Sequence, residues 1–129
     1  MKIDHIAIWT TNLENVKDFY IKYFNMKCSE KYVNPTKQFS SYFLGFEGEA
    51  TRIEIMHRED LAEVMRRNPM APGLTHLSIS VGSREKVDIL TEVLRNDGCK
   101  IVGEPRTTGD GYYESVVEDC EGNLVEITE

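Results

Sequence analysis

The sequence predicts an α+β fold made of two tandem βαβββ modules, whose strands form a curved mixed sheet around a concave cup. Two observations support this: a strand-like run leads into an amphipathic helix near the start, and the same succession recurs after residue 73. The length of 129 residues is usual for one domain. We therefore expect a single domain with module one at about 1–58, a linker at about 59–73 and module two at about 74–129.

The first module contains the clearer helix. Its apolar residues recur at helical spacing, and Asn12 and Asn25 suit the N-cap and the exit, so a helix is expected over about 13–24. The helical stripe consists of Leu13, Val16, Phe19, Tyr20, Tyr23 and Phe24. The strands of this module are expected at 3–9, 41–46 and 51–57.

The second module repeats the plan. Ser83 is the expected N-cap of a helix that ends at Gly98, with Val87, Leu90, Val93 and Leu94 as its apolar stripe. Strands are expected at 74–81, 100–102, 112–118 and 124–128, with a hairpin turn at 121–123. Between the modules, residues 58–67 could form a short polar helix, followed by a linker rich in Pro and Gly.

The composition excludes several classes of function. A hydrophobic fraction of 40% with 29% charged residues is that of an ordinary globular protein. The net charge of -7 argues against nucleic acid as a partner. No apolar stretch approaches membrane-spanning length and the start is polar, so we expect a cytoplasmic protein that does not bind membranes. Three cysteines without CxxC spacing predict reduced, partly buried thiols.

Two histidines and two glutamates fall at equivalent places in the duplicated unit. His5 and His76 lie 71 residues apart (76 minus 5), and Glu54 and Glu126 lie 72 apart (126 minus 54). The spacing within each module agrees as well, at 49 residues (54 minus 5) and 50 residues (126 minus 76). Duplicated units normally pack about a pseudo-twofold axis, which would bring the four side chains together.

Each of these four residues lies on the polar face of its expected strand, opposite an aliphatic face. Any one of them alone would be explained as a surface residue, but the joint pattern favours ligands. Two neighbouring carboxylates repel, and a divalent cation removes that penalty. One divalent-metal site is therefore predicted from His5, Glu54, His76 and Glu126, with Zn, Ni, Co, Fe or Mn as suitable ions.

Other residues have two interpretations. Trp9, Phe39, Tyr42 and Met56 could line a substrate pocket or belong to the core, while His57 is better explained as a surface residue. The polar, glycine-bearing segment 106–111 could be a loop over the cup, and an ordinary strand connection explains it equally well.

With these motifs the sequence resembles the vicinal oxygen chelate superfamily, and more narrowly glyoxalase I (lactoylglutathione lyase). The resemblance spans nearly the whole chain, and its motifs are His5-Ile6-Ala7-Ile8, Asp18-Phe19-Tyr20, Phe24-Asn25-Met26, Arg52-Ile53-Glu54-Ile55, Thr75-His76-Leu77-Ser78-Ile79 and the run from Glu118 to Ile127. It implies the glyoxalase/bleomycin-resistance fold, a homodimer and one divalent metal per site, with Ni, Co or Zn expected.

The resemblance also implies a reaction. It points to a metal-dependent lyase or isomerase that moves a proton through an enediolate on a thiol hemithioacetal or a similar small α-oxo compound. Glu126 and Glu54 would be the catalytic residues, with Glu126 as the proton-transferring ligand. Two alternatives share the fold: a resistance-type protein that sequesters a ligand, and a ring-cleaving dioxygenase. Glu54 favours glyoxalase I over dioxygenases, which generally use two histidines and one carboxylate, and over epimerases with glutamine there.

Two positions depart from the family pattern. Bacterial glyoxalase I typically has an arginine where this chain has Trp9, and often an asparagine where it has Arg58. An indole cannot form the ion pair with which an arginine holds a glutathione carboxylate. The expected small-molecule substrate therefore need not contain glutathione.

Overall fold

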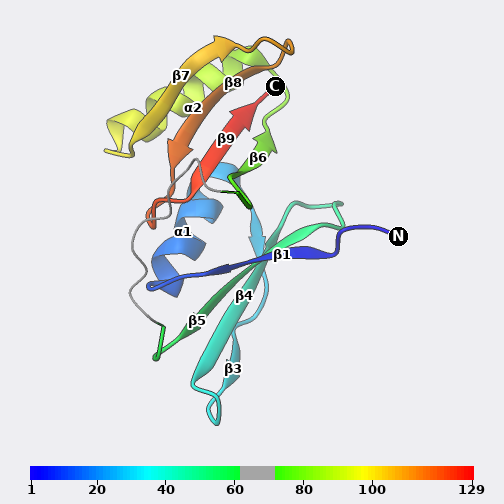
Figure 1. Cartoon of the computed structure of the whole chain (residues 1–129), viewed down its shortest axis with the longest axis vertical. Helices are drawn as coiled ribbons and strands as arrows, with labels where there is room; N and C mark the ends of the chain where they lie inside the picture. Colours follow the sequence, from blue (N-terminus) through cyan, green and yellow to red (C-terminus); the bar gives the residue numbers. More distant parts are fainter. Residues whose placement is uncertain (62–71) are drawn as a thin grey trace. The chain divides into compact units, whose positions relative to one another are not determined.

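The computed structural model describes residues 1–61 and 72–129, and the chain divides into two compact units, Met1–Met65 and Arg66–Glu129. Among its described residues, each unit has one sheet and one helix (Figure 1). The division falls inside the predicted linker at about 59–73. The polar helix predicted at 58–67 lies largely outside the described residues, and its first residue, Arg58, ends a strand instead.

The first unit follows the plan of a βαβββ module with one additional short strand after the helix. Its elements are β1 (His5–Trp9), α1 (Leu13–Phe24), β2 (Lys27–Cys28), β3 (Tyr32–Asn34), β4 (Phe39–Gly45) and β5 (Arg52–Arg58). The sheet has the order β1-β5-β4-β2, and β3 also pairs with β4. Strands β1 and β5 run parallel, whereas the pairings of β4 with β2, β3 and β5 are antiparallel.

Both ends of α1 are fixed by asparagine. The Asn12 side chain accepts a hydrogen bond from the backbone N–H of Asn15 at 3.1 Å, which satisfies one unpaired donor of the first turn. Asn25 adopts the left-handed conformation with φ of 53° and donates its N–H to the carbonyl of Ile21. The predicted helix limits are thus confirmed. The apolar stripe of α1 is buried against the sheet at Leu13, Val16, Phe19, Tyr20 and Phe24.

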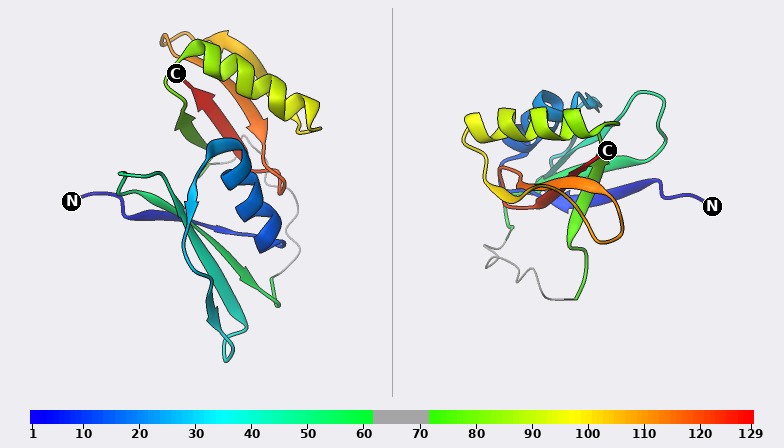
Figure 2. Two further views of the ribbon diagram at one scale, coloured as in Figure 1. Left: turned by 180° about the vertical axis from the view of Figure 1, so that it is seen from behind. Right: turned by 90° about the horizontal axis from the view of Figure 1, so that it is seen from above.

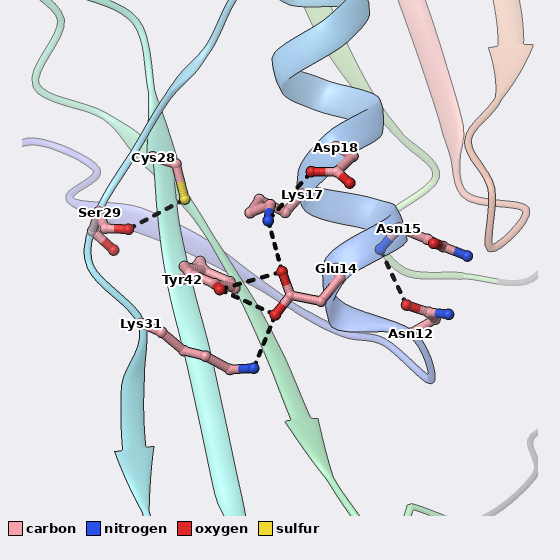
Figure 3. Close-up of polar contacts among 9 residues, drawn as sticks. All are labelled: Asn12, Glu14, Asn15, Lys17, Asp18, Cys28, Ser29, Lys31 and Tyr42. Carbon is pink, nitrogen blue, oxygen red and sulfur yellow. Dashed lines mark hydrogen bonds and ion pairs between the residues drawn. The ribbon is translucent and has the colours of Figure 1, made fainter.

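A polar cluster also ties the first turn of α1 to the sheet (Figure 3). The Glu14 carboxylate accepts hydrogen bonds from Lys17 at 2.6 Å, Lys31 at 2.9 Å and the Tyr42 hydroxyl at 3.0 Å. The hydrogen bonds from Lys17 and then Lys31 lower the pKa of Glu14 to about 2. This cluster therefore holds α1, β4 and the segment before β3 together at neutral pH.

The second unit repeats the plan of the first. Its elements are β6 (His76–Ser80), α2 (Arg84–Asn96), β7 (Ile101–Thr107), β8 (Tyr113–Glu118) and β9 (Leu124–Thr128), in a sheet of order β6-β9-β8-β7. Strands β6 and β9 are parallel, as β1 and β5 are in the first unit. The α+β class and the paired modules are therefore confirmed.

Helix α2 covers one face of its own sheet (Figure 2). Ser83 caps its N-terminus by accepting from the backbone N–H of Lys86 at 3.3 Å, as predicted. Its buried residues include Thr91, whose hydroxyl bonds to that of Ser115 on β8 at 2.7 Å. The core between the helix and the sheet includes Val87 and Leu94 of α2 together with Ile79, Val117, Val125 and Ile127.

Two features of the sheets differ from the prediction. The short strands β2 and β3 were not expected, and β7 extends to Thr107 rather than ending at residue 102. Strand β7 pairs with β8 through two register shifts, and it contains Pro105, which lacks a backbone donor and is tolerated at the sheet edge. The irregular pairing explains why the strand had no clear alternating pattern.

Candidate metal centre

His5 and Glu54 lie next to each other on one face of the first sheet. Parallel pairing sets His5 opposite Arg52 and Ala7 opposite Glu54, and alternation along both strands brings the two side chains to the same face. His5 Nε2 lies 3.7 Å from Glu54 Oε2, with 39% of the His5 side chain and 16% of the Glu54 side chain exposed. These two residues are called the first half-site below.

His76 and Glu126 form the second half-site with nearly the same geometry. The parallel pairing of β6 with β9 sets His76 opposite Leu124 and Ser78 opposite Glu126. His76 Nε2 lies 3.6 Å from Glu126 Oε2, and the exposed fractions are 43% and 17%. The sequence repeat thus corresponds to a structural repeat, because each unit brings its own histidine and glutamate together.

The donor set of each half-site fits a divalent metal. The separations of 3.7 and 3.6 Å exceed a good hydrogen bond. They are close to the distance of roughly 3.0–3.6 Å expected between two donors that each bind one ion at about 2.1 Å. Among the described residues, no group of three or more His, Cys, Asp or Glu side chains could hold a metal ion.

The first half-site has a carboxylate behind its histidine. Asp4 Oδ1 lies 3.0 Å from His5 Nδ1 and accepts a further hydrogen bond from Arg52 Nη2 at 2.7 Å. The hydrogen bond with His5, and after it the one with Arg52, hold the pKa of Asp4 below its usual value. The Phe43 ring meets the His5 ring edge-on at 5.4 Å, and the Arg52 guanidinium stacks over Phe43 at 4.3 Å.

The second half-site has a hydroxyl beside its glutamate. Ser78 Oγ donates to Glu126 Oε1 at 2.6 Å, which leaves Oε2 directed toward His76. Glu114 on β8 is buried beside Glu126. Burial is the main cause that raises the pKa of Glu114, and a hydrogen bond with Glu126 is the second. Arg106 forms an ion pair with Glu114 at 3.2 Å.

Sequence reasoning missed Glu114, although a signal was present. It lies in the strand predicted at 112–118, two residues before Val116, the partner of Glu126. Alternation therefore places it on the same face as Glu126. In the first unit the corresponding position of β4 is Ser41, two residues before Phe43, the partner of Glu54. Because the first module has no carboxylate at this position, the repeat between the modules does not indicate Glu114.

The residues proposed for a substrate pocket are divided between the two faces of the first sheet. Trp9, Phe39 and Met56 share the face of Glu54, and the Trp9 and Phe39 rings meet edge-on at 6.1 Å. Tyr32, which the sequence did not indicate, extends this group with its ring 6.0 Å from Phe39. Trp9 is 49% exposed. An aromatic cluster of Trp9, Phe39 and Tyr32 therefore lies on the same face of the sheet as the first half-site, further along the strands.

Tyr42 and His57 lie on the opposite face. Tyr42 pairs with Ile55, and its hydroxyl bonds to Glu14 on the helix side (Figure 3), so its assignment to a pocket beside Glu54 is wrong. His57 is half-buried rather than fully on the surface, and its Nδ1 donates to the Thr10 carbonyl at 2.9 Å. This histidine therefore has a structural partner away from Glu54.

The polar segment at 106–111 connects two strands. Arg106 and Thr107 belong to β7, and the turn that follows closes with a hydrogen bond from the Thr108 N–H to the Tyr112 carbonyl at 2.8 Å. The interpretation as a strand connection therefore fits. The predicted turn at 121–123 is confirmed, since Asp119 accepts from the backbone N–H groups of Glu121 and Asn123.

Two of the three cysteines have the partial burial that was predicted for them. Cys28 and Cys99 are partly buried and Cys120 is exposed, and no disulfide joins them within the described ranges. Burial raises the pKa of the Cys28 thiol, which disfavours the reactive thiolate. Among the described helices, none is long and apolar enough to cross a membrane.

The chain belongs to the Glyoxalase/Bleomycin resistance protein/Dioxygenase superfamily, whose family model matches residues 2–127. The resemblance seen in the sequence motifs is thereby confirmed at the level of the superfamily. This superfamily includes glyoxalase I enzymes together with proteins of other functions, so membership defines a class rather than one reaction. A comparison with curated proteins finds no match to the sequence.

Solved structures show the same fold at low sequence identity. Glyoxalase I from Zea mays matches with a TM-score of 0.81 and 22% identity, covering 98% of this chain but 44% of the maize chain. The trypanothione-dependent glyoxalase I of Leishmania major matches with a TM-score of 0.80 and 20% identity, covering 100% of this chain and 86% of that one. A glyoxalase family protein from Enterococcus faecalis matches with a TM-score of 0.77 and 23% identity, covering 99% of this chain and 97% of that one.

Proposed function

We propose that the protein is a metal-dependent lyase or isomerase of the glyoxalase I type, acting on a thiol hemithioacetal or a similar small α-oxo compound. The observation that carries the proposal is the matched pair of half-sites, with His–Glu separations of 3.7 and 3.6 Å. The same parallel strand pairing brings a histidine nitrogen and a carboxylate oxygen together in each unit, at a spacing suited to two donors of one ion. The similarity to two glyoxalase I structures agrees with this choice within the superfamily.

In this proposal the four residues His5, Glu54, His76 and Glu126 together hold one divalent ion, with Ni, Co or Zn expected. When bound, the ion offsets the negative charge that develops on substrate oxygens as a C–H bond breaks. The two imidazole Nε2 atoms supply neutral donors, and the two carboxylates balance the charge of the cation. Since each unit supplies two donors, a complete site needs both half-sites, from one chain or from two.

Glu126 is proposed as the base that moves a proton between adjacent carbons of the substrate. The Ser78 hydroxyl fixes its Oε1 at 2.6 Å, so its carboxylate is oriented as an efficient base must be. No hydroxyl holds Glu54, whose one ionic or hydrogen-bonded partner in the described part of the chain is His5 at 3.7 Å. Glu54 is accordingly assigned as the second carboxylate ligand.

We also propose a homodimer, because glyoxalase-type modules commonly assemble in pairs and a shared site is one way to unite the half-sites. Light scattering at micromolar concentration would then give twice the chain mass of 14.8 kDa. A metal-loaded monomer would require both half-sites to come from one chain.

The aromatic cluster of Trp9, Phe39 and Tyr32 favours a second candidate function. Its exposed rings, with Trp9 at 49% and Tyr32 at 55%, could stack on a flat compound, as expected of a protein that sequesters a ligand without turnover. The same rings could instead contact the apolar part of a substrate. Turnover distinguishes the two functions.

The test combines elemental analysis of the purified protein with assays on a panel of hemithioacetals formed from different thiols. The proposal expects one Ni, Co or Zn ion per complete site and turnover of at least one member of the panel. Metal-free protein that binds flat aromatic compounds would support the sequestering function. Bound iron with oxygen consumption would support a ring-cleaving dioxygenase.

A further inference from the structure

We propose that Asp4 is a positioning residue that fixes the tautomer and orientation of His5, so that the Nε2 lone pair of His5 faces Glu54. The inference rests on the proposed function in one respect, since His5 is there taken as a metal ligand. It concerns a residue outside the four ligands, and it follows from the hydrogen bonds around the first half-site.

The geometry determines which His5 nitrogen carries the proton. Asp4 Oδ1 lies 3.0 Å from His5 Nδ1, within hydrogen-bond distance. An ionised carboxylate can only accept, so Nδ1 must be the donor, and in neutral imidazole the lone pair is then on Nε2. Nε2 is the atom that lies 3.7 Å from Glu54 Oε2. A carboxylate that accepts from the remote nitrogen is the usual support of a metal-binding histidine.

Asp4 is itself held in place from the neighbouring strand. The Arg52 guanidinium donates to Asp4 Oδ1 at 2.7 Å, and the Arg52 backbone N–H donates to the Asp4 carbonyl at 3.0 Å. Arg52 in turn stacks over Phe43 at 4.3 Å, and the same ring packs edge-on against His5. The three residues Arg52, Asp4 and His5 therefore form a chain of charge-assisted contacts that ends at the metal-facing nitrogen.

The second half-site is built differently. Thr75 precedes His76, and in the described part of the chain the one ionic or hydrogen-bonded partner of the His76 ring is Glu126, at 3.6 Å from Nε2. There the additional hydrogen bond, from Ser78, goes to the glutamate instead. The first half-site thus orients its histidine and the second orients its glutamate. The Asp4 contact is the specific device of the first half-site, and Thr75 provides a matched control position.

The first readout needs no metal and no substrate. Long-range ¹H–¹⁵N NMR spectra of the full chain, recorded at about pH 8.5, where an ordinary imidazole is neutral, identify the tautomer of each histidine. His5 is expected in the Nδ1–H form in the native protein. Asp4→Ala should move it toward the Nε2–H form that free imidazole side chains prefer, whereas Asp4→Asn, whose amide oxygen can still accept, should keep much of the native form. Thr75→Ala should leave the His76 spectrum unchanged.

The second readout is Ni²⁺ affinity, measured by titration of metal-free protein. Loss of such a supporting hydrogen bond typically weakens metal binding about 10- to 100-fold, so Asp4→Ala should bind Ni²⁺ more weakly by that factor and Asp4→Asn by less. Asp4 is 59% exposed, so these variants are expected to fold.

The inference is overturned if native His5 is in the Nε2–H form, or if Asp4→Ala binds Ni²⁺ as tightly as the native protein. A native protein with the Nδ1–H tautomer that nevertheless fails to bind any divalent ion would refute the proposed function and not the role of Asp4 in setting the tautomer.

Discussion

Glu126→Gln separates metal binding from proton transfer. Glutamine has the size of glutamate and keeps one oxygen donor but lacks a basic carboxylate. Ser78 lies 2.6 Å from Glu126 Oε1, and a hydroxyl can accept as well as donate. It can therefore receive a hydrogen bond from the new amide group, while the amide oxygen takes the place of Oε2, 3.6 Å from His76. The second half-site should keep its shape and most of its metal.

Turnover should respond far more strongly than metal content. A positioned general base contributes about 10²- to 10⁴-fold, so Glu126→Gln should lower kcat by a factor of about 100 or more. That factor corresponds to about 2.7 kcal/mol in the activation free energy. The assay is the initial rate on the best hemithioacetal of the panel, with metal content measured on the same sample. A full-rate, fully metalled Glu126→Gln variant would refute the assignment of Glu126 as the base.

Glu54→Gln is the matched control, because Glu54 is as little exposed as Glu126 and lies at nearly the same distance from a histidine of its own unit, but no hydroxyl orients it. It should retain turnover within about tenfold if Glu54 acts only as a ligand. If Glu54→Gln is inactive and Glu126→Gln is active, Glu54 is the base and Glu126 the second carboxylate ligand. If both variants remain active, neither Glu54 nor Glu126 is by itself the required base.

Three further predictions concern stability and selectivity. The pKa of Glu14 is lowered from 4.5 to about 2, so the stability that this carboxylate adds to the fold is complete above pH 4.5 and is lost as the pH falls toward 2. Because the Glu14 side chain is 47% exposed, Glu14→Gln should lower the free energy of unfolding in urea by only about 1 kcal/mol or less at pH 7. Near pH 2 it should not lower it. An equal loss at both pH values would contradict the lowered pKa of Glu14. Leu94→Ala should lower the free energy of unfolding by about 2–5 kcal/mol, whereas Val93→Ala, at an exposed position, should change it by about 0.5 kcal/mol or less; equal effects would mean that α2 packs differently. Trp9→Arg should raise turnover of the glutathione hemithioacetal by restoring a partner for its carboxylate, and a folded, metalled variant without any gain would place thiol selection elsewhere.

The regular elements could be predicted because local chemistry determines them. Helix α1 has an asparagine cap at each end and a continuous apolar stripe between them, so its limits follow from the sequence. Strand β9 likewise has a clear alternation and a turn before it that Asp119 closes. Strand β2, with two residues, is too short to produce a periodic pattern. The bulged pairing of β7 with β8 depends on contacts across the sheet that local propensity does not contain.

The site could be predicted in part for a related reason. The repeat identifies the four candidate ligands, since equivalent residues of the two modules must occupy equivalent strands. It cannot identify what differs between the modules, and Asp4, Ser78 and Glu114 are such differences. Tyr42 was grouped with Phe39 although the two are three positions apart and therefore face opposite sides of β4. In the β4–β5 pairing Phe43 lies opposite Glu54, so Phe39 shares the face of Glu54 and Tyr42 lies on the other face.

If both half-sites hold the same metal ion, the metal content of the two histidine variants should reveal it. His5→Ala and His76→Ala each remove one neutral donor from a different unit. If the half-sites share an ion, elemental analysis of either purified variant should show metal content reduced to a small fraction of the native value. Full occupancy in both variants would contradict a shared ion, and loss in only one would mean that the ion is bound by a single half-site.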